Sequence, residues 1–306
     1  MKHKPGKPDI VAVLMGGPSS EREVSIQSGR NIAATLRSAG VDAREVVVAP
    51  DATFDLPEGT TRAFIALHGA FGEDGQIQRI LEQRRIPHTG NRPHACARAF
   101  DKVASKNRLV AEGVPTAPAA FFRNHLAPSE TPIPHIPAPL PLVVKPARQG
   151  SSVGVTVVRD EAAWPDAIRA AFALGDTILA ETYIPGRELT VSIVNGEALP
   201  ILEIFAPDGN YDYYAKYTPG ASHHAPAELP PDLAEAIRKT ALRTARALDC
   251  LALGRVDLRL RPDGAFFVLE LNNIPGFTAT SLLPDAARAA GWSPEETCLR
   301  ILSAAR

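Results

Sequence analysis

The segment that most constrains the fold is residues 254–281, which read GRVDLRLRPDGAFFVLELNNIPGFTATS. Two stretches of alternating apolar and polar residues, 255–260 and 265–271, flank the turn sequence Pro-Asp-Gly at 262–264. Alternation on both sides of such a turn is typical of an antiparallel β-hairpin. We therefore expect a two-stranded element here, buried on at least one face.

The predicted hairpin brings acidic side chains together. If Asp263 and Gly264 form a two-residue loop, counting back along both strands places Asp257 opposite Glu270, and Asn272 follows on the same face. Two carboxylates and an amide oxygen that converge on one sheet face repel one another unless a cation lies between them, and hard oxygen ligands suit Mg²⁺. A solvated polar face is the alternative, but these acids stand among apolar strand residues. The hairpin thus predicts a metal site.

A second candidate site is the loop 148–154, with the sequence RQGSSVG, between apolar strands at 142–146 and 155–158. Its Gly and Ser residues could present backbone amides and hydroxyls to phosphate oxygens, although a glycine-rich loop alone does not specify this. Lys145 strengthens the case, because a lysine in an apolar strand is costly to bury unless it meets an anion. No GxxxxGK[ST] sequence is present, so a Walker-type site is not supported.

Composition narrows the class of protein. The 306 residues are 45% hydrophobic, which suits two or three globular domains, and the net charge of −1 gives no general attraction to nucleic acid or an anionic membrane. The three cysteines lack metal-ligand spacing and are expected to be buried free thiols of a reducing compartment. The apolar run after the basic start is too short for a signal peptide or a membrane span. We expect a cytoplasmic protein that binds neither nucleic acid nor membrane.

Periodicity predicts an α/β chain that begins with a parallel sheet. Apolar strands at 10–15, 43–48 and 63–67 alternate with a helix that has an expected capping box at Ser20 and Glu23. The proline-rich segment 124–139 is expected to be an extended surface linker. We predict three domains, at residues 1–100, 101–185 and 186–306.

Several segments together resemble one enzyme family. They are GGPSSEREVSIQSG from residue 16, HGAFGEDGQIQ from residue 68, RVD at 255–257, ELNNIPGFT from residue 270 and SLLP at 281–284. They are similar to the D-alanine:D-alanine ligases of the ATP-grasp superfamily. Pro18, where Thr is common, and the proline-rich linker depart from the family pattern.

The resemblance implies a fold, a reaction and partners. It implies a three-domain ATP-grasp architecture that joins two D-alanines through an acylphosphate, releasing ADP and phosphate, for peptidoglycan precursor synthesis. It also implies ATP, two Mg²⁺ ions for which Mn²⁺ can substitute, and a homodimer.

The resemblance further implies roles for single residues in nucleotide and metal binding. Its phosphate ligands would be Lys102, Lys145, Ser151, Ser152 and Lys216. Adenine would bind Glu181 and the backbone near Tyr183 and Ile184, and the ribose would bind Glu188. From the residues alone, the last four would be a turn with solvated acids. The metal ligands would be Asp257, Glu270 and Asn272.

Substrate roles follow in the same way. The first D-alanine would meet Glu21 and His68, although an acid at a helix start and a lone histidine after a strand are often structural. The second would meet Ser281, Leu282 and Lys216, and the oxyanion would meet Arg255 and the amide of Gly276. Tyr217, in the tyrosine-rich segment 211–217 that resembles a closing loop, would bond with Ser151 and Glu21.

Two alternatives stay open at this point. One is a D-alanine:D-lactate ligase, against which the family's association of tyrosine at position 217 with dipeptide formation argues. The other is a nucleotide-binding protein of the same fold without turnover. The presence of all five expected phosphate and metal ligands argues against a degenerate binder, and these are Lys102, Lys145, Asp257, Glu270 and Asn272.

Overall fold

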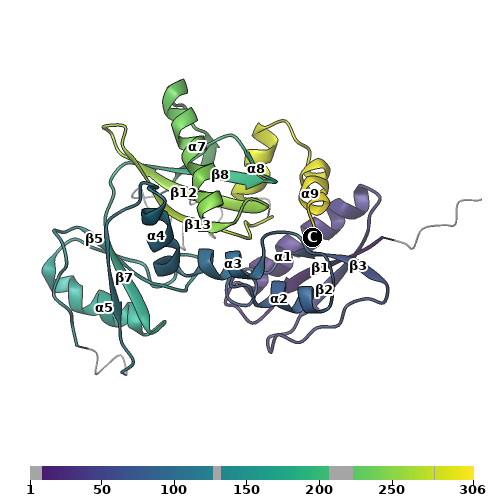
Figure 1. The fold of residues 1–306 in the computed structure, drawn as a ribbon, viewed down its shortest axis with the longest axis horizontal. Coiled ribbons are helices and arrows are strands. Elements are labelled where there is room, and N and C mark those ends of the chain that lie inside the picture. Colours follow the sequence, from purple (N-terminus) through teal and green to yellow (C-terminus); the bar gives the residue numbers. More distant parts are fainter. Residues whose placement is uncertain (1–8, 127–131, 207–222, 279) are drawn as a thin grey trace, which may run out of the picture.

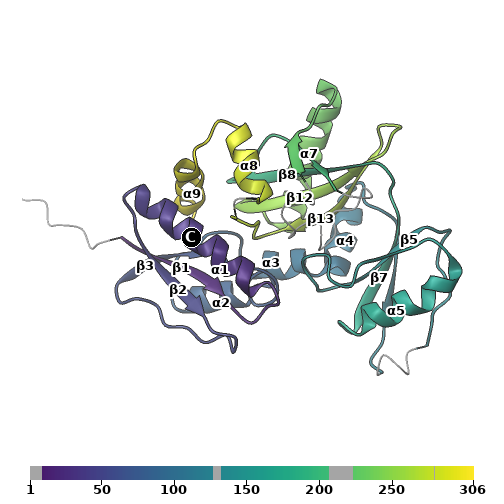
Figure 2. The same cartoon turned by 180° about the vertical axis from the view of Figure 1, so that it is seen from behind.

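The computed structural model describes residues 9–126, 132–206, 223–278 and 280–306. Its strands form three separate sheets. Figures 1 and 2 show the N-terminal sheet and the central sheet at opposite ends of the molecule, with the C-terminal sheet above and between them. In the part of the chain that the structure describes, no helix is long and apolar enough to cross a membrane.

The N-terminal sheet is parallel, as predicted, with the order β2-β1-β3. Its elements are β1 (Ile10–Gly16), α1 (Arg22–Ser38), β2 (Asp42–Val48), β3 (Thr60–Ile65), α2 (Gln76–Gln83) and α3 (Pro93–Phe100). Alternate residues of β1 enter two cores: Val11 and Val13 pack with α1, whereas Leu14 packs with α2. Burial on both faces explains the continuous apolar run of this strand.

The predicted capping box is wrong. Helix α1 begins at Arg22 with Glu21 at the N-cap, and no side chain caps it. Ser19, and not Ser20, accepts a hydrogen bond from the Glu21 amide, at 3.1 Å. The Glu21 carboxylate accepts a hydrogen bond from Ser151 of the distant loop, so this helix start faces another part of the fold.

The central sheet is antiparallel with the order β4-β7-β5-β6. Its elements are α4 (Lys102–Ala111), β4 (Ala119–Arg123), β5 (Leu142–Pro146), β6 (Thr156–Val158), α5 (Trp164–Phe172) and β7 (Thr177–Thr182). Strand β4 was not predicted. The described part of the proline-rich linker is extended but not merely superficial, because Ile133 and Ile136 pack against the core beneath α5 and Trp164 Nε1 donates to Pro134 O at 2.7 Å.

The C-terminal sheet has the order β11-β10-β8-β12-β13, with β9 beside β8. Its elements are β8 (Arg187–Val194), β9 (Glu197–Ala198), β10 (Leu202–Phe205), β11 (His223–Pro226), α7 (Pro231–Leu248), β12 (Leu253–Leu260), β13 (Phe266–Asn272), α8 (Leu282–Ala289) and α9 (Pro294–Ser303). Helix α7 covers one face together with α4, whose Leu109 shares that core. Helices α8 and α9 join the core beside α1.

The hairpin β12–β13 places Asp257 opposite Glu270 as predicted, but by a different route. The loop between the two strands has five residues, 261–265, with Gly264 at φ +86°, and Leu260 pairs with Phe266. A bulge then shifts the register between Asp257 and Leu258, because Leu269 is an extra residue on β13. The bulge restores the predicted pair and lets both Leu269 and Glu270 line the same cavity.

Candidate active site

A cavity of about 440 Å³ lies between the central and C-terminal sheets. Residues of β5, of the loop that follows it, of the end of β7 and of the hairpin line its wall. It therefore joins two of the sites predicted from separate stretches of sequence.

The loop after β5 forms one wall, with Gln149, Gly150 and Ser152 in contact with the cavity. Ser151 and Ser152 both have positive φ, at +51° and +57°, which side-chain-bearing residues seldom adopt. Successive residues of this kind turn backbone N–H groups toward one side, an arrangement suited to an anion. The strained backbone at Ser151 and Ser152 supports a binding role for this loop, because such strain is concentrated at functional sites.

Lysines and acids alternate across the floor of the cavity. Lys145 Nζ lies 2.8 Å from Glu181 Oε1, and both side chains are more than nine-tenths buried. Burial alone would lower the pKa of Lys145, but the charges of Glu181 and Glu270 outweigh it and raise this pKa. Lys102 Nζ lies 3.4 Å from Glu270 Oε2 and donates to Gln149 O at 2.7 Å. The floor therefore holds the Nζ atoms of Lys145 and Lys102, and that of Lys102 contacts the glycine-rich loop.

The far end of the cavity is formed by residues 183–188. Arg259, which sequence reasoning missed, donates from Nε to Ile184 O at 3.1 Å and from Nη1 to Glu188 Oε2 at 2.9 Å. Its guanidinium carbon lies 5.8 Å from the ring centroid of Tyr183. The sequence contained one indication of this role. Arg259 lies among apolar residues in the alternating strand β12, and an arginine that is buried there needs hydrogen-bond or ion-pair partners. Arg259 fixes the turn whose acids were predicted to meet a nucleotide.

The opposite end carries the predicted metal ligands. Asp257 is 5% exposed and accepts hydrogen bonds from Arg255 Nε and Nη2, at 2.8 and 2.7 Å. Thr190 Oγ1 and Asn272 Nδ2 also donate to it, at 2.6 and 2.9 Å. Glu270 faces Asp257 across the hairpin. Among the described residues no three His, Cys, Asp or Glu side chains form a metal cluster, so the third oxygen ligand here would be the amide of Asn272.

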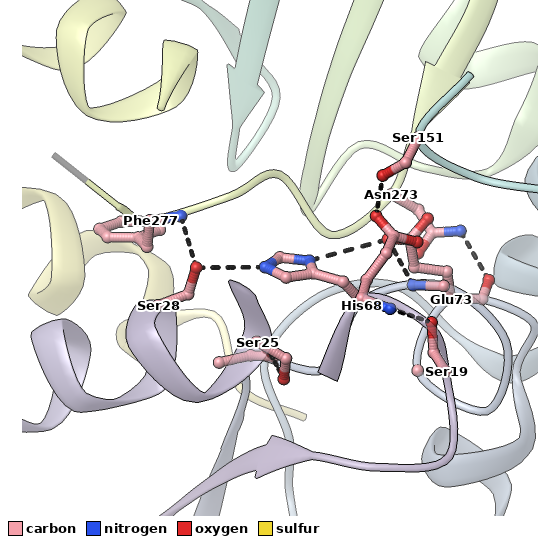
Figure 3. A network of polar contacts seen from close by, with 12 residues as sticks. Ser19, Ser25, Ser28, His68, Glu73, Ser151, Asn273 and Phe277 are labelled. Atoms are coloured by element: carbon pink, nitrogen blue, oxygen red, sulfur yellow. Dashed lines mark hydrogen bonds and ion pairs between the residues drawn. The ribbon is translucent and has the colours of Figure 1, made fainter. Parts of the chain in front are cut away.

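Residues from the N-terminal sheet approach the cavity beside the loop. Glu21 accepts a hydrogen bond from Ser151, and a Cβ on Gly69 would lie 2.6 Å from Glu21 Oε2, so the carboxylate lies close to the backbone at that glycine. Figure 3 shows His68 in a chain of polar contacts between Ser28 and Glu73. His68 Nε2 is 3.2 Å from Ser28 Oγ, and His68 Nδ1 is 3.8 Å from Glu73 Oε1.

Glu73 is another residue that sequence reasoning did not single out. Burial raises its pKa and the nearby charge of Glu21 adds to this, against the opposing influence of His68. Its carboxylate accepts from the amide of Gly69 at 3.1 Å, and Asn273 Nδ2 donates to its backbone carbonyl at 2.8 Å. Its place within HGAFGEDG was the signal, since an acid so close to His68 on a glycine-rich turn can reach the imidazole.

The residues predicted for the second substrate lie at the start of α8 and do not line the cavity. Ser281 Oγ accepts from Thr278 N at 2.9 Å, and a Cβ on Gly276 would lie 2.7 Å from this oxygen. Leu282 is 2% exposed and packs in the core, so only its backbone could contact a ligand. Lys216 and Tyr217 lie outside the described residues.

Comparisons with known proteins agree with this geometry. The family profile described as "D-ala D-ala ligase C-terminus" matches residues 109–303. The chain is 42% identical over 299 residues to a D-alanine–D-alanine ligase of Methylacidiphilum infernorum, covering 97% of this chain and 96% of that protein. It is 45% identical over 301 residues to one of Bordetella avium, covering 96% and 93%.

A solved structure is similar over the same extent. The crystal structure of the Bacillus anthracis D-alanine–D-alanine ligase complexed with ATP matches with a TM-score of 0.82 and 30% identity, covering 96% of each chain. The similarity in fold therefore extends over nearly the whole chain.

Proposed function

Because the chain belongs to the D-alanine–D-alanine ligase family, we propose that the cavity between its central and C-terminal sheets is where ATP drives the joining of two D-alanines. The reaction forms D-alanyl-D-alanine, ADP and phosphate for peptidoglycan precursor synthesis. One observation carries the assignment of the site: buried Lys145 of the central sheet, Lys102 of α4 and the paired carboxylates of the hairpin line the same cavity.

The nucleotide has a defined orientation in this proposal. Glu181 and the backbone of Tyr183 and Ile184 meet adenine, and Glu188 meets the ribose. The support is that all four line the cavity and that Arg259 donates hydrogen bonds to Ile184 O and to Glu188. The phosphates then extend toward the 148–154 loop, where Lys102, Lys145, Ser151 and Ser152 lie, with Lys216 added from outside the described residues.

The hairpin residues fit Mg²⁺. Asp257, Glu270 and Asn272 offer hard oxygen atoms on facing strands, which is the ligand chemistry of this ion. We propose that they hold two Mg²⁺ ions, with Mn²⁺ as a substitute, which would offset the negative charge of the transferring phosphoryl group. Arg255 and Lys102, which contact these carboxylates in the structure, balance their charge.

For the first D-alanine, Glu21 would pair with the ammonium group and His68 with the carboxylate. A carboxylate is a poor electrophile, so transfer of the γ-phosphoryl group to one of its oxygens makes an acylphosphate. The ammonium groups of Lys145 and Lys102 attract the negative charge of that step. Ser28 and Glu73 orient the imidazole, as their contacts with His68 indicate.

For the second D-alanine, Ser281, the backbone of Leu282 and Lys216 would hold the carboxylate. Its free amine attacks the acyl carbon, and phosphate leaves. Arg255 and the N–H of Gly276 would stabilise the tetrahedral oxyanion. Tyr217 would join the hydrogen bond between Ser151 and Glu21, which ties the loop of the central sheet to the N-terminal sheet.

Three further assignments belong to the same proposal. The domains are residues 1–100, 101–185 and 186–306, supported by one sheet in each. The protein is a cytoplasmic homodimer, as the sequence resemblance implies. Sedimentation equilibrium of the purified chain measures the oligomer, and a monomer at micromolar concentration would contradict this assignment.

The test of the proposed function is ADP release as a function of D-alanine and Mg²⁺. We expect release only when both are present, with D-alanyl-D-alanine as the product. A panel of D- and L-amino acids and D-lactate defines the specificity. ATP binding without D-alanine-dependent release would contradict the proposal.

A further inference from the structure

Lys106 is a buried lysine that none of the roles above uses. It lies on α4 and is 5% exposed, and it is absent from the cavity wall that Lys145 and Glu181 line. A buried ammonium group is unfavourable unless oxygen atoms surround it. The contacts of Lys106 therefore show which oxygen atoms offset the cost of its burial.

Three oxygen atoms surround the Lys106 ammonium, which has three protons to donate. It donates to Thr116 Oγ1 at 2.7 Å and to Ala117 O at 2.8 Å. Glu181 Oε1 lies 3.4 Å away. Thr116 Oγ1 in turn donates to Val268 O at 2.8 Å, so Thr116 links the ammonium to the backbone of β13 in the hairpin.

Glu181 Oε1 therefore lies close to two lysines, Lys106 and Lys145, whose other contacts differ. Lys145 lies nearer, at 2.8 Å, but it faces the cavity where phosphates are proposed to bind. Burial lowers the pKa of Lys106, and the neighbouring Lys145 charge adds to this, whereas the second carboxylate Glu270 raises that of Lys145. Glu181 is thus the carboxylate that offsets the burial of Lys106.

We propose that Lys106 is a positioning residue for adenine recognition, which holds the Glu181 carboxylate in place when nucleotide phosphates compete for Lys145. This inference rests on the proposed contact of Glu181 with adenine. The adenine 6-amino group donates a hydrogen bond, whereas guanine has a carbonyl oxygen at that position. The oxygen atoms of a carboxylate accept a hydrogen bond from the amino group, and they repel the carbonyl oxygen.

Without Lys106, whose Nζ lies 3.4 Å from Glu181 Oε1, the only ammonium group beside this carboxylate in the described part of the structure is that of Lys145, which faces the cavity. Glu181 would then follow Lys145 toward the phosphates and away from the 6-amino group of adenine. Discrimination between ATP and GTP should therefore fall, while groups at the reacting end of the cavity stay in place.

The experiment compares wild type with Lys106→Met and Lys106→Arg in ligation driven by ATP or GTP at saturating D-alanine. For Lys106→Met we expect the KM for ATP to rise about tenfold and the ATP:GTP ratio of kcat/KM to fall about tenfold, with kcat within about threefold. Lys106→Arg, which keeps the cation, should recover most of the ratio. Should Lys106→Met not fold, Lys106→Gln provides the same comparison, because it loses the charge but can still donate to Thr116.

Thr116→Val is the matched control, since it removes another partner of the same ammonium and leaves Glu181 untouched. It should lower Tm without changing base preference. An unchanged ATP:GTP ratio in the folded Lys106→Met variant, or an equal loss of preference in Thr116→Val, would overturn the proposal and leave Lys106 a structural lysine.

Binding of ADP and GDP by calorimetry separates this inference from the proposed function. Loss of ADP preference in Lys106→Met supports the inference even in a protein without ligation. A wild type that ligates D-alanine while its Lys106 variants bind both diphosphates as the wild type does contradicts the inference alone.

Discussion

Substitution of Glu270 by Gln separates the charge requirement of the reaction from the stability of the fold. Glu270 Oε2 lies 3.4 Å from Lys102 Nζ, with side chains 27% and 14% exposed. At an effective dielectric constant of about 20, this distance corresponds to about 5 kcal/mol of attraction before any cost is counted. Desolvation and side-chain ordering reduce the net value of partly exposed pairs to about 0–1 kcal/mol.

Glutamine keeps the volume of glutamate, so we expect the free energy of unfolding to change by about 1 kcal/mol or less and Tm by no more than about 2–4 °C. Turnover should respond far more strongly. If Glu270 holds metal that offsets several kcal/mol of charge in the transition state, kcat falls at least about 100-fold.

The assay pairs ADP release, titrated with Mg²⁺, with thermal unfolding of the same samples. Glu235→Gln on the exposed face of α7 is the control, because Glu235 is 48% exposed and pairs only with Arg238 and Lys239 among the described residues. Asp257→Asn provides a contrast, since Asp257 is buried and breaking its pair with Arg255 should cost about 3–5 kcal/mol of stability as well. A Glu270→Gln variant that unfolds many degrees lower while its folded fraction keeps wild-type turnover would refute the reasoning.

Three other predictions concern other parts of the molecule. Lys145→Ala should weaken ATP binding and lower kcat, each at least about tenfold, because it removes charge that meets phosphate in both states; unchanged values in calorimetry and turnover would make Lys145 structural. Tyr217→Phe should raise the ratio of D-alanyl-D-lactate to D-alanyl-D-alanine made from mixed substrates, most clearly at lower pH where the competing amine is protonated; a ratio equal to the wild type at every pH would contradict this. Burial raises the pKa of both Cys250 and Cys298 to about 12, so these thiols should not react with a disulfide reagent at neutral pH before unfolding. Because these pKa values lie above the ordinary value of 9.0, the unfolded chain loses the two thiol protons at lower pH than the folded chain does. The contribution of the protonated thiols to the free energy of unfolding is therefore complete below pH 9 and is lost as pH rises toward about 12. Unfolding measured at stepwise pH tests this.

The hairpin illustrates how far the sequence predicts this site. Alternation and the Pro-Asp-Gly turn were enough to predict that Asp257 faces Glu270. The count assumed a two-residue loop, whereas the structure has a longer loop and a bulge at Leu269 that cancel each other. Alternation does not reveal a bulge, because its cause is the fit of the strand to the sheet and the cavity.

Contacts between segments that are distant in the sequence were harder to predict. Lys106 and Glu181 are far apart in the sequence, and nothing near either residue indicates their partner. The predicted capping box at Ser20 and Glu23 was wrong, and here too a distant contact is involved. Glu21 is at the N-cap, and its carboxylate accepts a hydrogen bond from Ser151 in the loop after β5. Local patterns predict elements, whereas these pairings depend on how the three sheets pack.

The central claim is that ligation proceeds through an acylphosphate of the first D-alanine. The most direct test follows one carboxylate oxygen atom of that substrate. D-alanine labelled with ¹⁸O in its carboxylate is incubated with ATP and Mg²⁺, and the phosphate and the dipeptide are analysed by mass spectrometry. An acylphosphate pathway transfers one labelled oxygen to phosphate for each D-alanyl-D-alanine formed, because the carboxylate oxygen that takes up the phosphoryl group leaves with it. Unlabelled phosphate, or release of AMP and pyrophosphate in place of ADP, would contradict the account.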